Sequence, residues 1–359
     1  MPITKIAASG FSDAVNFRNI IINGDMSIAQ RSTSVSSLTS SNTYKTIDRY
    51  ATELGSNGTW TQSQSTDVPT GQGFGKSLKM DCTSTGSGGY LHITQRFEGQ
   101  NLIYLNKGRS TAESLTLSFW VKSAKTGTYI AEFRDTDNTR NISKSYTISS
   151  ADTWEKKTIT YPGDTSGGLS NDNGASLELN LWLAAGSSNT SGTLQTDWAS
   201  QVSANRAVGQ VNLGDSTSND WYITGLQLEA GTTASEFEFL PVDVNTQRCQ
   251  RYYLKFDRTS STSTLLLIGG FESSSAAGVG GLAMPVPMRA TPTLSFETGA
   301  RIYSDGLGGS TFSIGQNRCT NLVAACKADV SGTAVAGKAA YIYLSGDATP
   351  SNMELDAEL

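Results

Sequence analysis

The chain has 359 residues, of which 37% are hydrophobic and 16% are charged. This hydrophobic content is enough to build a core and excludes a largely disordered chain. The charged fraction is below the about 25% that is usual for globular proteins. A net charge of −5, with no block of lysine or arginine, argues against nucleic acid and anionic membranes as partners.

The N-terminal residues differ from the rest of the chain. Residues 1–19 show neither strand alternation nor a helical stripe, and they contain no charged-then-apolar signal segment. We predict that 1–19 is an anchoring segment that becomes ordered on another protein. The longest apolar run, 265–268, is far shorter than the about 18 residues that a membrane-spanning helix needs, so we expect no membrane insertion.

Residues 20–241 consist of short alternating segments rich in β-branched and aromatic residues. Glycine, serine, threonine and asparagine interrupt them about every ten residues, which is typical of an all-β sandwich. The clearest predicted strands are 77–82, 90–97, 115–122, 128–133, 145–148, 154–161, 177–183 and 221–228.

One short helix is predicted where the residue composition of the sequence changes. It begins after Asp243 and runs through 246–253, and Asp243 or Asn245 can cap its free N–H groups. Pro241 ends the preceding strand, and a polar serine and threonine tract follows the helix. We therefore predict a second, smaller β domain over residues 242–359.

Two tryptophans are predicted to lie among polar side chains. Strand periodicity places Trp120 opposite the apolar face of 115–122, and Trp182 beside Asn180 on the face opposite four leucines. An indole can stack on the apolar face of a sugar ring while polar neighbours bond its hydroxyls. Trp120, Trp182 and Asn180 are therefore candidate glycan-binding residues, and we expect one polar face to carry both tryptophans. The alternative is that loops or a partner subunit cover the tryptophans.

The sequence offers little for catalysis. The only histidine, His92, lies in an alternating strand, where a polar-face strand histidine is the simplest interpretation. The four cysteines are scattered, with no zinc-site spacing, and we expect them to stay reduced. The carboxylates form no evident pair, which leaves a glycosidase open but unsupported. Residues 134–138 resemble a fragment of a calcium loop, but the glycine and the terminal glutamate of an EF-hand are missing, so we predict a polar hairpin.

The stretch 276–288 contains no charged residue and is rich in glycine and alanine. Because Pro285 and Pro287 cannot donate to a sheet ladder, this stretch is predicted to be an edge or extended strip rather than a central strand. Such a strip would favour aggregation unless other chains cover it. We predict an oligomer interface that includes Val279, Leu282 and Met284.

Several stretches, in this order, resemble the carbohydrate-binding-module-like jelly roll of virion proteins from tailed bacteriophages. The stretches are 19–31 (NIIINGDMSIAQR), 48–50 (DRY), 118–122 (SFWVK) and 223–231 (ITGLQLEAG). Later stretches are similar to the C-terminal halves of phage tail-fibre and appendage proteins. These are 249–253 (CQRYY), 285–292 (PVPMRATP) and 355–359 (LDAEL).

The resemblance implies a jelly roll over 20–241 in a homotrimeric appendage on the outside of a phage particle, assembled in the host cytoplasm. Residues 1–19 would bind other virion proteins, and the jelly roll would contact a host-surface glycan. Related jelly rolls often hold a structural calcium where the first strand meets the last, which corresponds here to Asp25 with Gln227 or Glu229. The alternatives are a capsid decoration or connector without a ligand, and a glycan depolymerase. We expect a non-enzymatic protein with no other cofactor.

Overall fold

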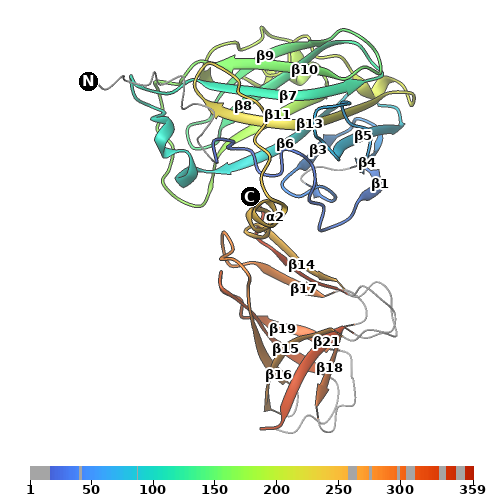
Figure 1. The fold of residues 1–359 in the computed structure, drawn as a ribbon, viewed down its shortest axis with the longest axis vertical. Helices are drawn as coiled ribbons and strands as arrows, with labels where there is room; N and C mark the ends of the chain where they lie inside the picture. The colour runs from blue at the N-terminus through green and yellow to red at the C-terminus, as the bar shows by residue number, and fades with distance from the viewer. Residues whose placement is uncertain are drawn as a thin grey trace, which may run out of the picture. The chain divides into compact units, whose positions relative to one another are not determined.

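The computed structural model describes residues 17–39, 43–86, 88–257, 265–274, 277–296, 300–304, 312–330, 337–344 and 352–359. The chain forms two compact units, Met1–Asn245 with Leu359, and Thr246–Glu358 (Figure 1). Every strand pairing in the described ranges is antiparallel, and the predicted all-β class is confirmed. In those ranges no helix has the length and hydropathy to cross a membrane.

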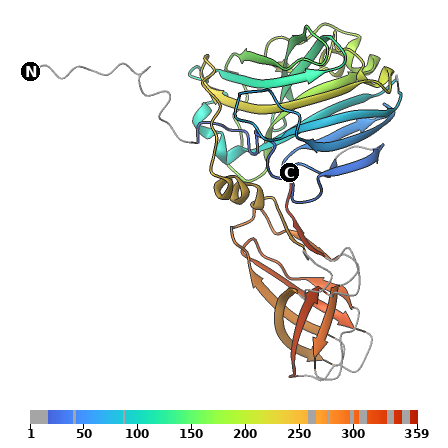
Figure 2. The same cartoon turned by 45° about the vertical axis from the view of Figure 1, so that its right-hand side comes forward.

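The first unit is a sandwich of two antiparallel sheets (Figure 2). The six-stranded sheet contains, in spatial order, β1 (Ser34–Leu38), β4 (Thr59–Ser65), β5 (Ser77–Ser84), β13 (Asp220–Ala230), β7 (Leu115–Ser123) and β10 (Glu155–Tyr161). The seven-stranded sheet contains β12 (Ala199–Ser200), β9 (Arg140–Ile148), β8 (Gly127–Asp135), β11 (Ala175–Ala185), β6 (Tyr90–Glu98), β3 (Ala51–Gly55) and β2 (Thr43–Tyr44). Each of the eight strands predicted from alternation is present.

Alternating side chains of the two sheets form one shared core. Leu117 and Phe119 of β7 and Leu179 and Leu181 of β11 are almost completely buried in it. Because successive side chains of a strand point to opposite faces, the residues between them face outward. The polar residues of β7 and β11 therefore lie on the outer faces of two different sheets.

The hairpin predicted at 134–138 is confirmed, because β8 and β9 pair from Gly127 with Ile148 to Asp135 with Arg140.

The predicted helix is α2 (Val242–Gln250), which begins before Asp243. It also ends earlier than predicted, since Tyr253 is the first residue of β14. A second short helix, α1 (Ser187–Thr190), follows β11 and was not predicted.

The second unit contains two smaller antiparallel sheets. The three-stranded sheet contains β14 (Tyr253–Asp257), β22 (Asn352–Asp356) and β17 (Thr293–Phe296). The six-stranded sheet contains β18 (Ala300–Ser304), β21 (Ala339–Leu344), β15 (Leu265–Ser274), β16 (Ala277–Ala283), β20 (Val323–Val330) and β19 (Phe312–Asn317). This unit has a separate core, to which Ile342, Leu344 and Leu355 belong.

The prediction of an edge strip at 276–288 is wrong. Strand β16 lies inside its sheet, where the backbone of Val279 pairs with Phe271 of β15 and Lys327 of β20. The two prolines do not interrupt this ladder, because β16 ends at Ala283 and they follow it. Leu282 and Met284 pack, partly buried, against the core of their own unit. The oligomer interface itself stays a prediction.

Candidate functional site

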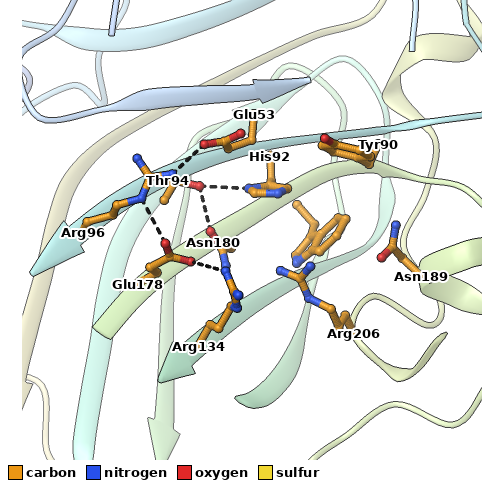
Figure 3. A pocket seen from close by; sticks show the side chains of 11 residues that line it. Glu53, Tyr90, His92, Thr94, Arg96, Arg134, Glu178, Asn180, Asn189 and Arg206 are labelled. Atoms are coloured by element: carbon orange, nitrogen blue, oxygen red, sulfur yellow. Dashed lines mark hydrogen bonds and ion pairs between the residues drawn. The ribbon is translucent and has the colours of Figure 1, made fainter. Parts of the chain in front are cut away.

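A cleft of about 290 Å³ lies on the outer face of the seven-stranded sheet. Strands β3, β6, β8 and β11 supply most of its lining, and α1 and the loop after the 3₁₀ turn Ser203–Asn205 supply the remainder (Figure 3). Every second residue of β6 from 90 to 96, and of β11 from 178 to 182, lines it. Apart from Gln95, the residues between them are the leucines and isoleucine of the core, so the alternation that builds the sandwich also builds the cleft.

A buried ion pair forms one wall of the cleft. Glu132 of β8 has no exposed surface, and it accepts hydrogen bonds of 2.8 Å from both Nε and Nη2 of Arg206. Asn141 Nδ2 and Trp182 Nε1 donate to the same carboxylate at 3.1 and 3.0 Å. Burial would lower the pKa of Arg206, but the charge and hydrogen bonds of Glu132 outweigh it and raise this pKa. The guanidinium is therefore a fixed, permanently charged group.

A second network of charged side chains lies at the other end of the cleft. Glu178 accepts from Arg96 Nε at 3.0 Å and from Arg134 Nη1 at 3.2 Å (Figure 3). Arg96 also donates to Glu53 Oε1 at 2.7 Å, and Arg134 Nε donates to Gln201 at 2.7 Å. Residues from four strands are thus held in one geometry by charge-assisted hydrogen bonds.

His92 lies between these two networks, and its tautomer follows from its partners. Thr94 Oγ1 donates its hydrogen to Asn180 Oδ1 at 2.7 Å, so His92 Nδ1, 2.9 Å away, is the donor to Thr94. Burial lowers the pKa of His92 well below 6.5, and Arg206, Arg96 and Arg134 lower it further. The imidazole is therefore neutral near pH 7, and Nε2 is a hydrogen-bond acceptor.

Aromatic rings line the same region of the cleft. The rings of Tyr90 and His92 are stacked at 5.9 Å between centroids and 26° between planes. Trp182 lies beneath them: its centroid is 4.7 Å from that of His92, and the guanidinium carbon of Arg206 is 5.0 Å above its ring. Trp182 is only 1% exposed, so it supports the cleft surface rather than forming a stacking platform.

The structure separates the three residues predicted to bind a glycan. Trp182 and Asn180 line the cleft on β11, and Asn180 is also 1% exposed. Trp120 lies half-buried on β7 in the other sheet, where it pairs with Lys156 and Thr224. The expectation of one polar face carrying both tryptophans is therefore wrong, because periodicity does not tell which sheet a strand joins.

The residues predicted to hold calcium do not fit that ion. Glu229 Oε1 lies 3.2 Å from Arg18 Nε, which supplies the positive charge, and Gln227 donates through Nε2 to Glu229 Oε2 at 2.9 Å. Gln227 Oε1 accepts from the Glu238 backbone, and Asp25 Oδ1 accepts from Asn245 and a serine hydroxyl. Nowhere in the described ranges do three or more acidic, histidine or cysteine side chains gather as a metal site.

Several residues of the cleft had no sequence signal. Arg96, Arg134, Glu132 and Arg206 look like ordinary charged residues of strands and loops in the sequence. The only signal was that polar residues alternate with apolar ones, except at Gln95 and Ile130, along three separate stretches, 90–97, 128–133 and 177–183. That pattern marks outward-facing positions but does not show that the three strands are neighbours.

Comparisons with known proteins assign no family. No family model and no curated protein sequence matches the chain. Among solved structures, the chain is similar to the enzymatically active domain of tailspike protein 4 of bacteriophage CBA120, with 15% identity and a TM-score of 0.32. That alignment covers 59% of this chain and 21% of the tailspike chain.

Two smaller proteins align over nearly their whole length. A putative sugar binding protein from Bacteroides thetaiotaomicron has 13% identity and a TM-score of 0.33, over 59% of this chain and 99% of that chain. A family 11 carbohydrate-binding module from Clostridium thermocellum, solved with a mixed-linked tetrasaccharide, has 12% identity and a TM-score of 0.27, over 56% and 99%. At these values the likenesses establish neither a family nor a ligand, so the function proposed below depends on the cleft.

Proposed function

We propose that the cleft on the seven-stranded sheet binds a glycan without transforming it. The observation that carries this proposal is the lining: fixed polar groups of four strands, with stacked rings at one end, surround about 290 Å³. Ligand pockets start at about 300 Å³ and combine apolar or aromatic surface with a few placed polar groups.

The hydrogen-bonding groups of the cleft match a polyhydroxylated ligand. Sugar hydroxyls both donate and accept, and the cleft offers guanidinium and amide donors together with the acceptor Nε2 of His92. The two ion-pair networks hold these groups in place before a ligand arrives, which lowers the entropic cost of binding. The half-buried ring of Tyr90, stacked on His92 and lining the cleft, gives the apolar face of a sugar ring a surface to contact.

The charged groups of the cleft support binding rather than hydrolysis. Its two lining carboxylates, Glu53 and Glu178, both accept hydrogen bonds from Arg96. A glycoside hydrolase needs one carboxylic acid to protonate the leaving oxygen and a second carboxylate on the opposite side of the bond. Two carboxylates that share one guanidinium are arranged to hold that cation. We expect no release of reducing ends from any polysaccharide.

The test is glycan titration with a variant that leaves the networks intact. The side chain of Asn189 lines the cleft from α1 and makes no hydrogen bond within the described part of the chain. Asn189→Ala should therefore weaken binding to any glycan that the protein captures from a polysaccharide panel by about fivefold to tenfold. Trp120→Ala, on the other sheet, is the matched control and should leave affinity unchanged. If Trp120→Ala weakened binding and Asn189→Ala did not, the binding site would lie on the six-stranded sheet instead.

The role in the particle is a separate proposal, supported by the sequence resemblance. We propose that the protein is an external appendage of a tailed-phage virion, anchored through residues 1–19, in which the jelly roll contacts host-surface glycan. Residues 1–16 lie outside the described residues. Micrographs of virions labelled with antibody should show the protein on the tail. Label confined to the capsid would favour the decoration or connector alternative.

A further inference from the structure

The arginines of the cleft indicate which class of glycan it binds. We propose that the ligand is an acidic glycan, whose carboxylate is bound by the guanidinium groups of Arg134 and Arg206. This inference deepens the proposed function and rests on it.

Both arginines keep N–H groups that the protein itself does not use. Arg206 bonds Glu132 through Nε and Nη2, and Arg134 bonds Gln201 and Glu178 through Nε and Nη1. No hydrogen bond joins Arg206 Nη1 or Arg134 Nη2 to any residue in the described ranges. Both side chains line the cleft, with 15% and 34% of their surface exposed. Each therefore presents charged donors to a ligand.

The two guanidinium groups come from the two networks and lie on the same outer face of the sheet. Glu132, which holds Arg206, comes two residues before Arg134 on β8. Alternation puts these two positions on one face of the strand, roughly 7 Å apart along it. We propose that a carboxylate between them accepts from both guanidiniums, whose planar N–H geometry matches its two oxygens.

The acidic residues of the cleft leave this positive charge exposed. The Glu132 carboxylate is completely buried behind Arg206. The side chains of Glu178 and Glu53 are only 10% and 14% exposed, and both are paired with arginine. The pKa of His92 is lowered first by burial and then further by the positive charges of Arg206, Arg96 and Arg134, which is consistent with this arrangement. The cleft surface thus has more cationic groups than anionic ones, which suits a ligand carboxylate, a group that supplies acceptors only.

The experiment compares each acidic polysaccharide with its own neutral form. The probes are polygalacturonate, alginate and hyaluronate, each beside its carboxyl-reduced product, together with neutral glucans, galactans and xylans. Reduction converts the carboxylate to a hydroxymethyl group and keeps the sugar backbone. Affinities of the full chain are measured by calorimetry. We expect at least one acidic probe to bind, and its reduced product to bind at least tenfold more weakly.

Two variants separate a specific contact from general attraction. Arg134→Gln should weaken binding of the acidic probe about tenfold and binding of its reduced product less than threefold. Lys156→Gln is the control: it removes one positive charge from β10 of the other sheet and should change neither affinity. Equal losses in the two variants would mean non-specific attraction and overturn the inference.

The outcomes distinguish this inference from the proposed function. If reduced products bind as tightly as the acids, or only the neutral glycans bind, the acidic specificity is refuted while glycan binding stands. If no member of the panel binds, acidic or neutral, both proposals are overturned.

Discussion

Glu132 and Arg206, 74 residues apart in sequence, form a two-point ion pair in which both hydrogen bonds measure 2.8 Å. The carboxylate has no exposed surface, whereas the guanidinium reaches the cleft. The pair therefore joins the interior of the jelly roll to its candidate binding surface. Removing either partner changes stability and binding together.

Arg206→Ala should destabilise the jelly roll by about 3 to 5 kcal/mol, because it leaves a buried carboxylate without its partner. The measurement is urea unfolding followed by tryptophan fluorescence. All six tryptophans lie between residues 60 and 221, so the signal reports on the first unit only. Arg109→Ala, at an exposed position, is the control and should stay within about 0.5 kcal/mol of the parent. A loss below 1 kcal/mol for Arg206→Ala would contradict the buried pair.

His92 should make the jelly roll less stable as the pH falls below 6.5. The folded state keeps the imidazole neutral, while the unfolded chain binds a proton near its ordinary pKa of 6.5. Between the unfolded and the folded pKa the unfolded state holds more protons, so stability rises with pH. The slope is about 1.4 kcal/mol per pH unit, and it vanishes above the unfolded pKa.

The measurement for His92 is the free energy of unfolding at half-unit steps from pH 5 to 8. His92→Gln should remove this contribution, and because the chain has no other histidine the difference curve isolates it. Parallel curves for parent and variant would show that the imidazole is not held neutral in the folded state.

We predict that Arg18, rather than a calcium ion, stabilises the junction of the first and last segments of the jelly roll. It lies 3.2 Å from Glu229 and also donates to Ser235 Oγ at 2.7 Å. We expect Arg18→Ala to cost about 1 to 2 kcal/mol, since partly buried hydrogen bonds to charged groups are lost. Calcium or a chelator should move the parent Tm by less than about 1 °C. A chelator-induced drop of several degrees would show that a metal site exists.

The homotrimer remains a prediction of the sequence, and light scattering tests it. The full chain should have three times the mass of one 38.1 kDa chain. Leu282→Asp should reduce that mass, and tryptophan fluorescence of the jelly roll should be unchanged, because the substitution lies in the other unit. Circular dichroism of the variant checks that its C-terminal sheets persist. A parent mass of one chain would refute the trimer.

Periodicity in the sequence determined the fold class and the faces of single strands. Hydrophobic residues at every second position of β7 and β11 must face a core, whatever the remainder of the chain does, because a strand has a repeat of two. The same rule correctly assigned Trp182 and Asn180 to the face opposite the leucines. Pro241 and the capping residues Asp243 and Asn245 likewise predicted the helix near residue 245, although its ends lie two to three residues from the predicted ones.

Only the tertiary structure decided which strands are neighbours in a sheet, and therefore which strand faces form one surface. Strand β7 pairs with β13 and β10, and β11 pairs with β6 and β8, so Trp120 and Trp182 belong to different sheets. The pairing of distant strands also brings Arg206 to Glu132 and surrounds β16 on both sides. Such pairings depend on the fit of long-range partners summed over whole sheets. No local propensity encodes that sum, so the cleft could not be located from any single stretch of sequence.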